Sequence, residues 1–160
     1  MFSIMIKNNN LVTLLNELIE INNDRIKGYQ LAAAELTKSD IDLRALFRSM
    51  ANDSKYYVTE LTELVRELGG ASSNETTNKG KAYQAWMNVK STFSGHDRQG
   101  ILDSCEYGEA EAQQAYQNAL TSELNLNEEI RSLIATQQTS LKTAHDLIKT
   151  FKHAAQAIEA

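Results

Sequence analysis

Proline is absent from this chain of 160 residues, and glycine occupies only 7 positions. Few residues therefore interrupt helices, while the good helix formers alanine, leucine, glutamate, glutamine and lysine are abundant. The sequence predicts an all-α protein. Its length suits one domain over residues 1–160, large enough to bury roughly 70% of the surface of the unfolded chain.

Cysteine is also scarce, because Cys105 is the only one, and there are 3 histidines. A single cysteine excludes an internal disulfide, and no cluster of cysteine and histidine indicates structural zinc. The apolar run at the N-terminus is too short for a signal peptide. We therefore expect a reduced, cytoplasmic protein with Cys105 in its core.

Long apolar runs and clusters of positive charge are missing as well. No 18 consecutive residues are apolar, so a membrane-spanning helix is not expected. The 16 basic residues are outnumbered by 21 acidic ones, which gives a net charge of −5. We therefore expect neither nucleic acid nor a membrane as a partner.

Apolar residues recur at alternating steps of three and four along four long segments, which is the spacing of amphipathic helices. We predict helices over about residues 10–37, 40–68, 97–124 and 127–159. Their candidate N-caps are Asn8 to Asn10, Ser39 or Asp40, Asp97, and Asn125 or Asn127.

The lengths of the connections select a topology for these helices. Short loops join the first helix to the second and the third to the fourth, so each pair is antiparallel. Residues 69–96 form a long crossover that contains a short helix around Trp86. This crossover can span a helix about 39 Å long, so the second and third helices run parallel. Two antiparallel hairpins joined by a long crossover are the ferritin-like arrangement of a four-helix bundle.

The apolar stripe is interrupted near the middle of every helix. A buried carboxylate is costly unless it is paired or bound to a metal, so the interruptions predict one shared polar centre. A di-metal centre in this fold needs Glu-x-x-His on two helices, and the second and fourth segments lack that pattern. The interrupting residues are Asn22, Arg25, Asp53, Ser54, Glu106, Glu109 and Gln137.

We favour a structural polar layer formed by Arg25, Asp53, Glu109 and Gln137. In this interpretation Arg25 bridges Asp53 and Glu109, because a guanidinium group carries five donors suited to carboxylates. Gln137 satisfies the remaining hydrogen-bond donors and acceptors of the layer. No cofactor is then expected. The alternative is a degenerate iron or manganese site, whose candidate ligands are Glu20, Asp24, Asp53, Glu106, Glu109 and His145.

Three stretches carry a resemblance to a known family: Gly80 to Lys90, Ile101 to Glu109, and Ala115 to Leu120. They resemble an uncharacterised proteobacterial family of ferritin-like four-helix bundles. The likeness extends over nearly the whole chain and implies a ferritin-like fold with no established biochemical role. The recurring polar residues of that family correspond here to Glu20, Asp24, Glu106, Glu109, Gln138 and His145.

Two functional hypotheses remain open, and a third possibility is a small-ligand pocket between the helices beside Gly28, Ala32, Gly108 and Ala112. The first is a non-enzymatic helical protein that packs with itself as a homodimer or with a protein partner. The second is a metal-binding protein that oxidises or stores iron. No nucleophile motif or phosphate-binding loop is present, so the sequence names no catalytic or cofactor-binding residue and favours the first hypothesis.

Overall fold

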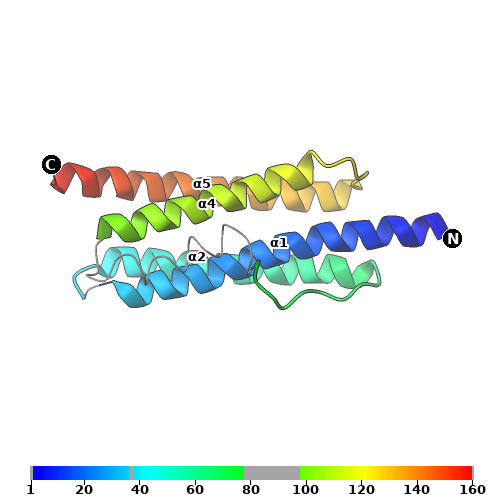
Figure 1. Ribbon diagram of the computed structural model, residues 1–160, viewed down its shortest axis with the longest axis horizontal. Coiled ribbons are helices and arrows are strands. Elements are labelled where there is room, and N and C mark those ends of the chain that lie inside the picture. The colour runs from blue at the N-terminus through cyan, green and yellow to red at the C-terminus, as the bar shows by residue number, and fades with distance from the viewer. Residues whose placement is uncertain (1, 37, 78–97, 160) are drawn as a thin grey trace.

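The described part of the chain forms a bundle of four long helices (Figure 1). The computed structural model describes residues 2–36, 38–77 and 98–159, and it contains no strand in these ranges. Helix α1 spans Phe2–Glu35, α2 spans Ile41–Glu67, α4 spans Arg98–Leu120 and α5 spans Glu128–Glu159. The prediction of an all-α four-helix bundle is confirmed.

The helices form two antiparallel hairpins, α1 with α2 and α4 with α5. The hairpins meet where α1 contacts α4 and where α2 contacts α5. In Figure 1, α2 and α4 run in the same direction, as the connection lengths predict. The short helix predicted around Trp86 falls within residues 78–97, outside the described part of the chain.

Two helix ends differ from the sequence-based bounds. Helix α1 begins at Phe2 rather than near residue 10, so Asn8 to Asn10 lie inside it and do not cap it. An asparagine inside a helix costs at most about 0.7 kcal/mol, too little to stop it without glycine or proline nearby. Helix α4 ends at Leu120 rather than near residue 124. Asn127 caps α5, because its Oδ1 accepts a hydrogen bond of 2.9 Å from the Ile130 amide.

Glycines at the end of α2 direct the chain back onto α1. Gly69 adopts a φ of +80°, and the Gly70 amide donates to the Val65 carbonyl at 3.0 Å, which closes the helix. A Cβ atom on Gly70 would lie 2.6 Å from Cγ2 of Val12, so only glycine allows this approach to α1. Residues 71–77, which we call the return segment, then run along α1 toward its middle (Figure 1).

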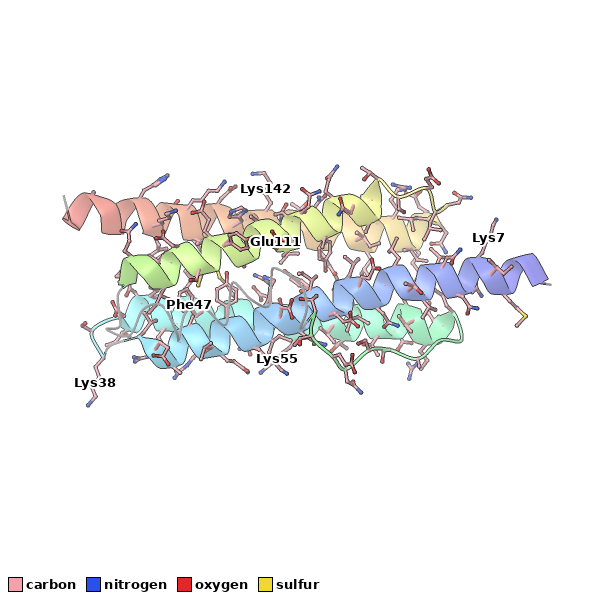
Figure 2. The ribbon with its side chains drawn as sticks, in the orientation of Figure 1. Lys7, Lys38, Phe47, Lys55, Glu111 and Lys142 are labelled. Carbon is pink, nitrogen blue, oxygen red and sulfur yellow. The ribbon has the colours of Figure 1, made fainter. Side chains whose placement is uncertain are left out.

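The core consists of two apolar clusters, one toward each end of the bundle. The first includes Leu15, Leu61 and Ile134, and the second includes Phe47 and Ile148. Figure 2 shows Phe47 pointing between the two hairpins, whereas the labelled lysines point away from them. Each such large side chain contributes about 1.5–3 kcal/mol when it is fully buried. None of the described helical stretches has the hydrophobic length that a bilayer-spanning segment needs.

Candidate functional site

A buried ion pair lies between the two apolar clusters. Arg25 of α1 and Glu109 of α4 have side chains exposed by only 1% and 0%. The Nε and Nη2 atoms of Arg25 donate to Oε1 of Glu109 at 3.0 and 2.7 Å. Its Nη1 donates to Oγ of Ser54 on α2. The guanidinium group therefore ties three helices together, and its charge is compensated inside the protein.

Tyr29 completes the surroundings of Glu109. Its hydroxyl donates to Oε1 of Glu109, and its ring centroid lies 5.3 Å from Cζ of Arg25. Burial, together with the neighbouring carboxylate, raises the pKa of Tyr29 well above its usual value, so the phenol keeps its proton and remains a donor. Burial alone would lower the pKa of Arg25, but Glu109, together with Tyr29 and Tyr116, outweighs burial and raises it. The guanidinium group stays charged at any physiological pH.

A chain of neutral hydrogen bonds extends from this ion pair to α5. Oγ of Ser54 donates to Oδ1 of Asn22 at 3.0 Å, and Nδ2 of Asn22 donates to the Tyr116 hydroxyl at 2.8 Å. That hydroxyl donates to Oε1 of Gln137 at 2.6 Å. Nε2 of Gln137 in turn donates to Oε1 of Glu60 at 3.2 Å. We call the buried residues the central polar layer: Asn22, Arg25, Tyr29, Ser54, Glu109, Tyr116 and Gln137.

Asp53 is the predicted layer residue that the structure does not place there. It is exposed, whereas its neighbour Ser54 is buried and accepts from Arg25. Successive residues of an α-helix point about 100° apart, so only one of the two can face the core. The prediction that Arg25 bridges Asp53 and Glu109 is therefore wrong at Asp53, and a neutral hydroxyl stands in its place.

Two candidate metal ligands, Glu20 and Asp24, bind the return segment instead of facing the central polar layer. Oε2 of Glu20 accepts from Oγ of Ser73 at 2.7 Å. Oδ1 of Asp24 accepts from the Thr77 amide at 2.9 Å, and its Oδ2 accepts from the Thr77 hydroxyl. Burial raises the pKa of Asp24 above its usual value, although both hydrogen bonds from Thr77 oppose that shift.

Asn16 and Asn23 extend this set of contacts along the same face of α1. Asn16 donates to the Ala71 carbonyl at 3.0 Å and accepts from the Ser73 amide at 2.8 Å. Nδ2 of Asn23 donates to the Glu75 carbonyl at 2.8 Å. We call the four α1 side chains that hold the return segment the outer ladder: Asn16, Glu20, Asn23 and Asp24. Sequence reasoning missed the outer ladder, although its spacing of four, three and one residues marks one polar helix face.

The remaining candidates lie where α4 faces α5. Oε2 of Glu106 accepts from Nζ of Lys152 at 2.6 Å, and this contact lowers the pKa of Glu106. His145 is partly buried, and burial, helped by Lys149, lowers its pKa. In the described part of the chain, Nε2 of His145 and Oε2 of Glu109 are buried atoms without a hydrogen-bond partner. Gln138 donates to Oε1 of Gln117 at 3.0 Å, near the surface.

The central polar layer does not fit a pair of metal ions. It offers one carboxylate, Glu109, and one oxygen of that carboxylate already accepts from Arg25 and Tyr29. A fixed positive charge next to this oxygen repels a divalent cation. Across residues 2–36, 38–77 and 98–159, no three histidine, cysteine, aspartate or glutamate side chains lie close enough together to hold a metal. The site's chemistry is that of an internal ion pair.

Comparison with protein families gives a match to this chain. Residues 10–122 match the family described as a domain of unknown function, DUF2383. The chain belongs to this family. A comparison with curated proteins gives no match.

Among solved structures, a mutant of Dps1 from Mycobacterium smegmatis is similar to this chain with a TM-score of 0.76. The two share 12% sequence identity, and the match covers 91% of this chain and 97% of the other. At that identity the likeness shows the fold alone, which is the ferritin-like four-helix bundle that the connection lengths predict. The DUF2383 family chain thus has a ferritin-like fold with an arginine in its central polar layer.

Proposed function

We propose that this protein is a non-enzymatic, ferritin-like helical protein whose central layer is held by an internal guanidinium group instead of metal ions. The observation that carries the proposal is the ion pair of Arg25 with Glu109, buried at the point where three helices meet. The pair compensates the one carboxylate of the layer and fixes the register of the helices. A bundle of this kind acts through its surface, by binding another copy or a protein partner.

The proposal places the protein in the bacterial cytoplasm. Cys105, its only cysteine, is a buried free thiol that packs in the second apolar cluster. A free thiol persists in a reducing compartment, and its burial protects it from oxidation. Burial also raises the pKa of Cys105 well above its usual value, so this thiol does not act as a nucleophile.

Elemental analysis tests the proposal directly. The protein is produced in medium supplemented with iron and manganese, purified without chelators and measured beside its Glu109→Ala variant. We expect far less than one metal equivalent per chain in both, because Arg25 already neutralises Glu109. About two equivalents in the parent protein that disappear in the variant would overturn the proposal.

A second candidate function is the binding of a single iron or manganese ion between α4 and α5. The observation that favours it is that Oε2 of Glu109 and Nε2 of His145, on facing helices, are buried and have no hydrogen-bond partner among the described residues. Imidazole and carboxylate are ligands that both metals accept. Under this hypothesis one equivalent is retained by the parent protein and by a Lys142→Ala control, and is lost from a His145→Ala variant.

A further inference from the structure

We infer that two copies of this chain associate through the outer face of α2, in antiparallel orientation around a two-fold axis near Tyr56. This inference rests on the proposed function and names the partner as a second copy. The outer face consists of Arg48, Asn52, Tyr56, Thr59 and Glu63, which recur at steps of three and four and are all exposed. They therefore form one continuous stripe on the side of α2 that faces away from the core.

Opposite charges stand at equal distances from the centre of this stripe. Arg48 lies seven residues before Lys55, and Glu63 lies seven residues after Tyr56. At 1.5 Å per residue, each charge is about 11 Å from a centre between Lys55 and Tyr56. When a second α2 packs antiparallel around that centre, Arg48 of one copy meets Glu63 of the other twice. The helix surface is therefore complementary to itself, as a two-fold interface requires.

Tyr56 occupies the middle of the outer face with 63% of its surface exposed. Tyrosine is enriched at protein interfaces because it buries a large apolar ring and keeps a polar tip. Asn52 and Thr59 flank it by one turn on either side, and their short side chains allow two helix axes to approach within about 8–10 Å. At that separation, arginine and glutamate side chains on facing helices reach one another.

The charged groups of the outer face are available for this contact. Arg48 is exposed, so its guanidinium group can reach a carboxylate on an incoming helix. Glu63 accepts from Arg66 one turn along its own helix, but both side chains are more than half exposed. An exposed pair of this kind contributes at most about 1 kcal/mol, so Glu63 can also accept from an incoming Arg48. Since each chain carries a net charge of −5, the dimer should dissociate readily.

Charge reversal with mixing tests the interface. Sedimentation equilibrium of the full chain at low salt should show a dimer with a dissociation constant on the order of 10 µM, typical of a small interface. Arg48→Glu alone and Glu63→Arg alone should each weaken dimerisation at least tenfold, because each places two like-charged pairs across the axis. An equimolar mixture of the two variants should dimerise again, since both contacts then join opposite charges.

The control is Lys142→Glu, which changes an exposed side chain on α5, far from the outer face of α2 in sequence. This variant should dimerise like the parent protein. Circular dichroism checks that each variant is folded, and recovery in the mixture excludes misfolding independently. The inference is overturned if the parent chain stays monomeric at about 100 µM, an upper range for weak dimers, or if the single variants still dimerise. It is also overturned if the mixture does not recover. None of these surface variants should change the metal content of the protein. Failure of the dimer can therefore be distinguished from failure of the proposed function, which elemental analysis tests.

Discussion

Helix α1 carries two polar faces that use similar residues for different purposes. Asn22 and Arg25 point into the bundle and bond to side chains on other helices. Asn23 and Asp24 lie between them in sequence, but they face the return segment and bond to its backbone. The difference follows from helix geometry, since each residue turns the next by about 100°. Polarity alone does not indicate whether a residue belongs to a site; its place around the helix decides.

The two faces should differ in how much stability each residue contributes. A side chain in the central polar layer is fully desolvated, so removing its partner leaves a buried charge or an unpaired polar atom. In the outer ladder Asp24 is buried, but Asn16, Glu20 and Asn23 are partly exposed, so water can replace a contact that one of these three loses. Changes in the layer are therefore expected to cost more than changes in the ladder.

The largest effect is expected for Arg25→Met. This change leaves Glu109 buried at 0% exposure without its counter-charge, and the free energy of unfolding should fall by about 3 kcal/mol. Urea denaturation followed by circular dichroism measures it. The matched control is Lys27→Met on the exposed face of the same helix, which should change little. An unchanged Arg25→Met protein would mean that the guanidinium group points to solvent.

Tyr116→Phe should have the next largest effect. It removes the hydroxyl that accepts from Asn22 and donates to Gln137, so two buried amides each lose a partner. We expect a loss of about 1–3 kcal/mol in the free energy of unfolding, measured in the same way. The control is Tyr107→Phe, because Tyr107 is 48% exposed on the same helix. Equal losses in both variants would remove the distinction between buried and exposed hydroxyls.

Asp24→Asn tests the outer ladder through its pH dependence. Because burial raises the pKa of Asp24 above 3.8, the folded chain holds this proton more tightly than the unfolded chain does. The stability that protonated Asp24 contributes to the folded chain is fully present below about pH 4 and is lost as the pH rises through the raised pKa of Asp24. The parent protein should therefore lose stability relative to Asp24→Asn as the pH rises above about 4. Parallel pH profiles of the two proteins would contradict this account.

Asp53→Ala should have the smallest effect. Asp53 is exposed and lies next to Ser54, which occupies the position in the layer. A surface substitution of this kind usually changes the free energy of unfolding by less than about 0.5 kcal/mol. A loss comparable to that of Arg25→Met would instead place this carboxylate beside the guanidinium group.

Local periodicity accounts for the parts of the fold that the sequence reveals. The apolar stripes predict the four helices and their connections, and the interruptions at Arg25, Glu109 and Gln137 mark residues that the structure brings into one layer. Asp53 and Ser54 both interrupt the apolar stripe of α2, and the sequence alone favours Asp53 for the layer because it can pair with Arg25. The structure places the smaller one inside, where a hydroxyl can accept from Arg25 without a second buried charge.

Long-range contacts account for what the sequence does not reveal. The outer ladder exists because the return segment lies along α1, a contact between residues more than 50 positions apart. No local pattern encodes which helix face a crossover will follow. The start of α1 at Phe2 is missed for a different, local reason. The low helix propensity of asparagine is too weak to locate a helix end.

If the guanidinium group of Arg25 compensates Glu109, no metal ion should bind in the central polar layer. Anomalous diffraction from crystals soaked in manganese tests it most directly. We expect no anomalous peak within coordination distance of either oxygen of Glu109, with Arg25 still bonded to Oε1. A peak between Glu109 and His145, with Arg25 turned away from the layer, would contradict it.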